Sequence, residues 1–130
     1  MIKCIPSLAA FAVALNLTIA GAMAGEMKPY SEAAFSAAKA GGKTVLLDFH
    51  ADWCPVCQKQ GPLLQSLLQE DKFKGIVAFK ANYDNETELK KQFKVTNQST
   101  LIVFKGEKAV SRATWVSDKE KIRALMEKGL

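Results

Sequence analysis

The sequence predicts a single α/β domain with a central mixed β-sheet flanked by helices on both faces. Its 130 residues are 48% hydrophobic and 24% charged, which is typical of one globular domain and leaves no room for a second. Helical and strand patterns follow in the order helix, strand, helix, strand, helix, strand, strand, helix, and this order implies such a sheet. A net charge of +5 with no basic cluster longer than Lys90-Lys91 argues against a nucleic-acid partner.

The first half of the domain is predicted to contain a helix, a buried strand and a second helix. Residues 31–40 begin with a serine that can cap a helix and are followed by Gly41-Gly42, which favours a helix end. The run TVLLDF at 44–49 is β-branched and apolar and is long enough for a buried strand. Residues 58–70 carry apolar side chains at positions 63, 64, 67 and 68, which is helical spacing, and Pro62 should kink that helix.

The second half adds two helices and three strands. Strands are predicted at residues 76–81 and 100–105, and a turn at Gly106-Glu107 leads into a third strand that ends near Thr114. Residues 86–93 and 118–128 have the patterns of helices.

The first 24 residues differ from the rest and predict a cleaved export signal. Lys3 precedes residues 5–20, which are mostly Ala, Leu, Ile, Val and Phe. The small-x-small sequence AMA at 22–24 is typical of a signal-peptidase site, so cleavage is expected after residue 24. An uncleaved anchor is the alternative, but the apolar run is shorter than the roughly 20 residues that cross a bilayer. Residues 25–130 are therefore expected to be an exported domain, located in the bacterial periplasm and without stable membrane insertion.

Loss of the leader, which carries Cys4, leaves Cys54 and Cys57 as a Cys-x-x-Cys pair. A structural disulfide between them would close a loop of very few residues and stabilise the fold little. A zinc site needs about four ligands, whereas the chain has one histidine, His50, and no second pair of this kind. Covalent haem attachment needs a histidine where the chain has Gln58. A redox-active dithiol is the interpretation that remains.

The predicted strand and helix place Cys54 at a helix N-terminus. Unpaired backbone N–H groups and the helix dipole favour a thiolate there. Pro55 suits the first helical turn because its missing N–H is not needed at that position. Lys59 also favours the thiolate and Asp52 opposes it, so the ionisation of the thiol stays open at this point.

The segment around the cysteines resembles the active-site region of thioredoxin-like proteins. It reads DFHADWCPVC at 48–57, and the similarity continues through Gly61-Pro62, FKANYD at 79–84 and TLIVFK at 100–105. The resemblance extends from about residue 31 to the end of the chain. It implies the thioredoxin fold and thiol-disulfide oxidoreductase activity on protein disulfides, without a bound cofactor.

The resemblance also implies roles for four residues. Cys54 would be the exposed nucleophile that forms a mixed disulfide with the substrate, and Cys57 would resolve it. Asp48 corresponds to the buried carboxylate behind the second cysteine, and burial should raise its pKa so that it can take and return a proton. Lys80 corresponds to the lysine beside that carboxylate. Without the surrounding motif, Asp48 would be interpreted as a strand-end cap and Lys80 as a solvated strand residue.

The largest departure from the family is at Ser99, where thioredoxins have a cis-proline opposite the cysteines. A cis bond before serine would cost about 2.5–4 kcal/mol, so we predict a trans peptide between Gln98 and Ser99. Without the proline, substrate docking should change, and a hydroxyl or water should approach Cys54 and Cys57 more freely.

Five further residues are expected to shape or tune the site. Trp115 falls near a family glycine, where it either narrows the substrate groove or is a partly exposed aromatic on the hairpin. His50 stands where the family often has an aromatic residue, and we expect it to pack there and tune the electrostatics of the dithiol. Trp53 packs beside the active-site turn or in the core. Pro55 and Val56 differ from the dipeptide of the common cytosolic form, and that dipeptide tunes the reduction potential.

These features lead to three hypotheses about function. The preferred one is an exported, monomeric reductant of protein disulfides, fed by a membrane electron transporter because ADWC at 51–54 is similar to exported domains of that kind. A carrier of a soft metal such as copper or zinc, bound by Cys54, Cys57 and His50, is the second hypothesis. The third is a non-catalytic binding module with the same fold.

Overall fold

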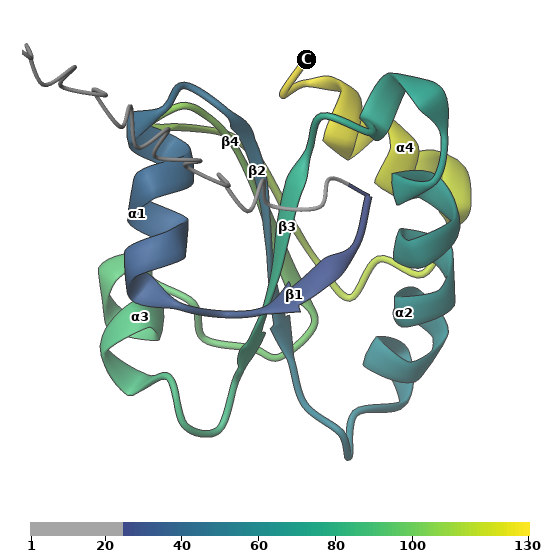
Figure 1. The fold of residues 1–130 in the computed structure, drawn as a ribbon. Helices are drawn as coiled ribbons and strands as arrows, with labels where there is room; N and C mark the ends of the chain where they lie inside the picture. Colours follow the sequence, from purple (N-terminus) through teal and green to yellow (C-terminus); the bar gives the residue numbers. More distant parts are fainter. Residues whose placement is uncertain (1–24) are drawn as a thin grey trace, which may run out of the picture.

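The structure is a computed structural model that describes residues 25–130 (Figure 1). The predicted leader, residues 1–24 with Cys4, lies outside the described residues, so cleavage of the leader stays a prediction. Within 25–130, none of the helices has the length and apolar character needed to span a bilayer. In chain order the elements are β1 (Met27–Pro29), α1 (Glu32–Ala40), β2 (Thr44–His50), α2 (Pro55–Leu68), the 3-10 turn η1 (Asp71–Phe73), β3 (Val77–Asn82), α3 (Thr87–Gln92), β4 (Thr100–Lys105), β5 (Lys108–Thr114) and α4 (Lys119–Glu127).

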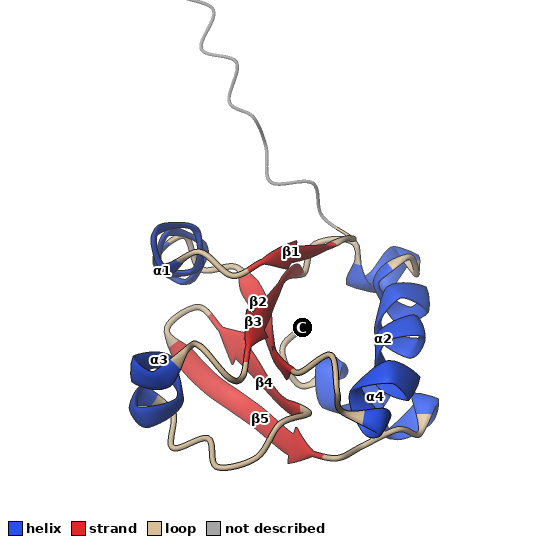
Figure 2. Cartoon of the chain, turned by 90° about the horizontal axis from the view of Figure 1, so that it is seen from below, coloured by secondary structure: helices blue, strands red, loops and turns tan. Residues whose placement is uncertain are grey.

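The five strands form one mixed sheet in the order β1-β3-β2-β4-β5. β3 pairs in parallel with both β1 and β2, whereas β4 pairs antiparallel with β2 and β5. Helices α1 and α3 cover one face, and α2 and α4 cover the other (Figures 1 and 2). The predicted three-layer α/β architecture is therefore confirmed, and β2 lies at the centre of the sheet.

Two apolar clusters fill the space between the sheet and its helices. Leu46 of β2 belongs to the cluster under α2 and α4, while Leu47 and Phe49 belong to the cluster under α1 and α3. This division follows from the two-residue period of a strand, and burial on both faces explains why β2 reads as a continuous apolar run. By the same alternation, Asp48 and His50 lie on the face covered by α2 and α4.

The helices begin where capping side chains are available. Ser31 accepts a hydrogen bond from the backbone N–H of Ala34 at the start of α1, and Asp118 does the same for Lys121 at the start of α4. Helix α2 begins at Pro55 and continues through Pro62. Gly61 precedes this proline, and a residue without a Cβ tolerates helical geometry there better than others do.

The sequence prediction omitted β1. This strand has three residues, lies at the edge of the sheet and ends in Pro29, so it has neither the length nor the alternation of a recognisable strand. It forms because its backbone pairs with β3, from Met27 opposite Ala78 to Pro29 opposite Lys80. The pairing brings Met27 and Pro29 close to the residues described next.

Candidate active site

The two cysteines lie where β2 turns into α2. The backbone N–H of Cys54 donates to the carbonyl of Ala51 at 3.1 Å, which closes the turn. Cys54 then caps α2, and its Sγ accepts the backbone N–H of Cys57 at 3.2 Å. Both cysteines are free thiols, so the structure describes the reduced dithiol. The predicted position of the nucleophile at a helix N-terminus is confirmed.

The expectation that Cys54 is exposed is wrong for this structure, because its relative exposure is 1%. The thiol points back over the first turn of the helix, and both cysteines form a small buried cluster with Ala51. Val56 and Tyr83 pack against this cluster. The structure therefore covers Cys54 with these neighbours.

Cys57 is as buried as Cys54, and it ionises less readily than a free thiol. Burial raises its pKa, and the neighbouring sulfur of Cys54 raises it further. The backbone at Ala51 and the hydroxyl of Ser99 act in the opposite direction and favour the thiolate. Cys57 is therefore held as a thiol until a base removes its proton.

Ser99 is fully buried beside Cys57, and its peptide bonds are trans, as predicted: residues 25–130 contain no cis peptide. Its Oγ has no hydrogen bond of good geometry within that range, although it is close enough to Cys57 to influence the thiol. The backbone N–H of Ser99 donates to the Phe49 carbonyl at 2.7 Å, and its carbonyl accepts the N–H of Trp115 at 3.0 Å. Ser99 and Trp115 both have a φ of 60°, a conformation that costs a side-chain-bearing residue about 1–2 kcal/mol.

Asp48 is buried on the face of β2 that α2 and α4 cover, and its relative exposure is 3%. Burial raises its pKa to about 7, although the positive charge of Lys80 partly offsets this effect. Lys80 of β3 pairs with Asp48 of β2 in the sheet register, and Lys80 is exposed. The structure thus confirms a buried carboxyl with a raised pKa and a lysine neighbour. A pKa near neutrality suits Asp48 to exchange a proton at physiological pH.

His50 turns towards Asp52 rather than completing a metal site. Its Nε2 lies 3.0 Å from the Asp52 carboxylate, and its side chain is 18% exposed. In the part of the chain that the structure describes, no three His, Cys, Asp or Glu side chains gather as metal ligands. The arrangement gives no support to the ligand set of Cys54, Cys57 and His50.

The residues next to the dithiol are placed on the surface. Trp53 is 56% exposed, and its indole N–H donates to Asp84 at 2.9 Å, so a core role for Trp53 is ruled out. Pro55 is exposed and Val56 half-buried in the first turn of α2. Trp115 is 54% exposed at the end of β5, which agrees with an exposed aromatic on the hairpin. Its effect on a substrate groove stays a prediction.

The sequence analysis assigned no role to three residues that support the site. Asp84 holds the Trp53 indole, and Tyr83 packs on the cysteine cluster while its N–H donates to the His50 carbonyl at 2.8 Å. Both lie within the FKANYD motif, which was a usable signal. Gln60 is buried in α2, and its side-chain amide donates to the Val116 carbonyl at 2.8 Å. Nothing in the sequence marks Gln60 as more than a polar helix residue.

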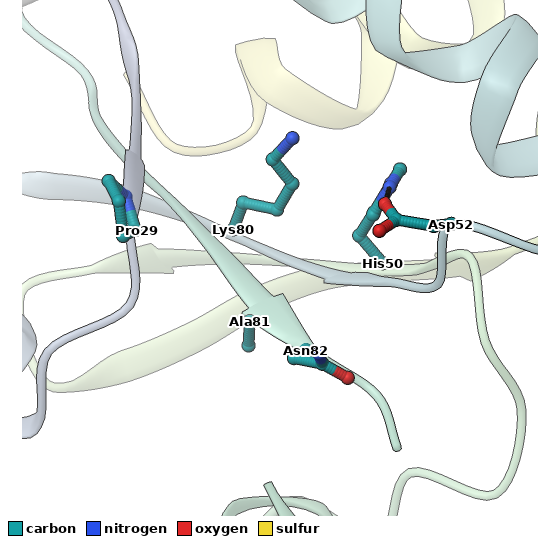
Figure 3. Close-up of a pocket in the computed structure, with 6 residues that line it drawn as sticks. All are labelled: Pro29, His50, Asp52, Lys80, Ala81 and Asn82. Carbon is teal, nitrogen blue, oxygen red and sulfur yellow. Dashed lines mark hydrogen bonds and ion pairs between the residues drawn. The ribbon is translucent and has the colours of Figure 1, made fainter. Parts of the chain in front are cut away.

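Two neighbouring clefts lie beside Asp48. An outer cleft of about 200 Å³ is lined by Pro29, His50, Asp52, Lys80, Ala81 and Asn82 (Figure 3). An inner cleft of about 180 Å³ is lined by Met27, Asp48, His50, Gly61, Leu64, Gln65 and Lys80. His50 and Lys80 are common to both clefts, and Figure 3 shows their side chains extending to the same side of the sheet.

A dithiol at the N-terminus of a helix, backed by a buried carboxyl on the central strand, defines a thiol-disulfide oxidoreductase of α/β architecture. The family model for thioredoxin matches residues 26–128. The chain belongs to the thioredoxin family and is a protein-disulfide oxidoreductase.

Individual relatives agree with this assignment. A thioredoxin from Alicyclobacillus acidocaldarius is 36% identical over 94 residues, which cover 72% of this chain and 89% of the relative. A thioredoxin from Chlamydia trachomatis is 33% identical over 84 residues, covering 65% and 80% of the two chains. The crystal structure of Trxlp from Edwardsiella tarda aligns with a TM-score of 0.75 at 36% identity and covers 78% of this chain and 98% of that one.

Proposed function

We propose that this protein is an exported reductant of protein disulfides, located in the bacterial periplasm and supplied with electrons by a membrane transporter. The predicted leader at residues 1–24 supports export. Because the dithiol is the only redox centre among the described residues, each catalytic cycle needs a partner that restores the two thiols.

The environment of Cys57 is the observation that carries the reducing direction. A dithiol acts as a strong oxidant when its reduced form is stabilised, usually as a thiolate. Here burial and the neighbouring Cys54 sulfur raise the pKa of Cys57, so the environment opposes the thiolate. Cys57 therefore lacks the thiolate stabilisation that makes a dithiol a strong oxidant, which supports the reducing direction.

The proposed chemical cycle gives a role to each of three residues. Cys54 attacks a substrate disulfide, forms a mixed disulfide and releases one substrate sulfur as a thiolate. Asp48 as carboxylate takes the proton of Cys57, and the Cys57 thiolate attacks the Cys54 sulfur. The bond between Cys54 and the substrate breaks, so the substrate leaves with its second thiolate and the protein keeps the Cys54–Cys57 disulfide.

The reduction potential of residues 25–130 tests the direction. We expect a value near or below about −230 mV from equilibration against thiol-disulfide buffers. A value nearer about −120 mV would make the protein an oxidant and would overturn the proposed direction.

Two cysteine variants test the roles of the sulfurs. Cys57→Ser should accumulate a mixed disulfide with a substrate protein, whereas Cys54→Ser should form none. If Cys54→Ser kept the full biological effect, a binding module would explain the protein better than catalysis does.

A further inference from the structure

Asp48 can act as a base in the resolving step only as a carboxylate, so below its pKa of about 7 its proton must first leave for the solvent. The relative exposure of Asp48 is 3%, and its Oδ1 has no hydrogen-bond partner within residues 25–130. The carboxyl does line the inner cleft, which has room for water molecules. The other side chains that bound this cleft therefore decide how the proton leaves.

His50 connects the inner cleft to the surface. It lines both clefts, and its Nε2 contacts Asp52, whose side chain is fully exposed. Figure 3 shows the imidazole and the Asp52 carboxylate side by side at one end of the outer cleft. Two positions apart on β2, His50 and Asp48 lie on the same face of the sheet.

We propose that His50 is a proton-relay residue that carries the proton of Asp48 to solvent, assisted by Asp52. The inference rests on thiol-disulfide exchange at Cys54 and Cys57. Below pH 7 Asp48 is mostly a neutral carboxylic acid before the resolving step. That proton passes through cleft water to the imidazole, Asp52 stabilises the imidazolium, and the proton then leaves to bulk water, which restores the Asp48 carboxylate.

The other groups around the two clefts fit this assignment. Lys80 from β3 is the remaining charged group that lines them, and it cannot accept a proton while it is charged. The residues contributed by β1 and α2 do not titrate: Met27, Pro29, Gly61, Leu64 and Gln65. The relay should matter most below pH 7, because the pKa of Asp48 is raised to about 7 and its proton must then be removed before each resolving step.

Single-turnover kinetics test the relay. Reduced protein is mixed with a synthetic peptide that contains one intramolecular disulfide, and the mixed disulfide is trapped by acid and quantified by mass spectrometry. In the His50→Ala and His50→Phe variants, we expect Cys54 to attack the peptide disulfide at the same rate as in the wild-type protein. Resolution at pH 6 should be about tenfold slower, less than a group in direct proton transfer contributes, because water partly replaces the relay. At pH 9 the difference should disappear.

Rescue by imidazole separates proton transfer from a structural role. Added imidazole should restore resolution in His50→Ala at pH 6 and leave wild type unchanged, while thermal midpoints show that both variants are folded. Wild-type resolution rates in the variants at pH 6 would overturn the relay. A slowing that is equal at pH 6 and 9 and does not respond to imidazole would overturn it too. If wild type formed no mixed disulfide at all, the exchange chemistry itself would fail, and the relay with it.

Discussion

Asp48 is a residue whose ionisation opposes folding while it serves the chemistry. Its pKa is raised from 3.8 in the unfolded chain to about 7 in the folded protein. Below pH 4 both states hold the proton and the residue costs nothing. Between about pH 4 and 7 the folded state keeps a proton that the unfolded state releases, so stability falls as pH rises and levels off above pH 7.

Asp48→Asn should therefore stabilise the protein at alkaline pH. Three pKa units correspond to about 4 kcal/mol, so the variant should gain up to about that free energy of unfolding at pH 8 and much less at pH 4.5. Urea denaturation at the two pH values measures the gain. The exposed Asp71→Asn variant serves as control and should show no such difference. An equal effect at both pH values would contradict the assigned pKa.

Ser99 combines a buried hydroxyl with a strained backbone, and substitutions can separate the two. Ser99→Ala removes the hydroxyl that favours the Cys57 thiolate, so the pKa of Cys57 should rise further. Thiolate absorbance during alkaline titration measures this change. Ser99→Gly should raise the pKa equally but also stabilise the fold by about 1 kcal/mol, because glycine adopts a φ of 60° without strain. An unchanged Cys57 titration in both variants would show that the hydroxyl has no influence.

At the scale of elements, the end of α4 is packed closely against the sheet. A Cβ at Gly129 would lie 2.6 Å from Thr44 Cγ2 and 2.7 Å from Val103 Cγ1, on β2 and β4. Both contacts are closer than real Cβ atoms approach. The glycine thus lets the chain after α4 lie directly on the two central antiparallel strands.

Gly129→Ala should destabilise the protein by about 1–3 kcal/mol through this overpacking. Gly75→Ala is the matched control, since a Cβ there meets no atom within 4 Å. Thermal or urea unfolding of the two variants gives the comparison. Equal stabilities would mean that the α4 terminus moves aside at no cost.

The helices and strands differ in how well the sequence predicts them. The strand at 100–105 was predicted with its observed bounds because its apolar run is bounded by turn residues, and α1 and α4 were placed within a residue or so by their caps. β1 was missed because only pairing with β3 makes it a strand.

The same division holds in the active site. The raised pKa of Asp48 was expected because Asp48 corresponds to the family's buried carboxylate. The burial of Cys54 was not expected: Cys54 belongs to a cluster against which Tyr83, a residue distant in sequence, packs. The sequence also did not predict the left-handed backbone of Ser99, which makes hydrogen bonds to Phe49 and Trp115, two residues distant in sequence.

At the scale of the whole molecule, the family assignment covers residues 26–128, and the predicted leader lies before that region. Export should remove residues 1–24 and leave Gly25 as the first residue of the mature chain. Mass spectrometry of the periplasmic fraction of a bacterium that expresses the full chain measures this terminus. An uncleaved chain recovered with the membranes would contradict the prediction and favour an anchor.

The two edges of the sheet bear on how the molecule behaves in a crowded compartment. β1 offers three residues and ends in Pro29, which has no N–H to donate, while β5 carries Lys108 and Arg112 and its pairing with β4 is irregular between Val103 and Phe104. Short length, proline, positive charge and a bulge are the features that discourage strands from adding to one another. Both edges are therefore poor templates for aggregation. An exposed strand of another protein therefore finds little backbone here on which to extend a shared β-sheet.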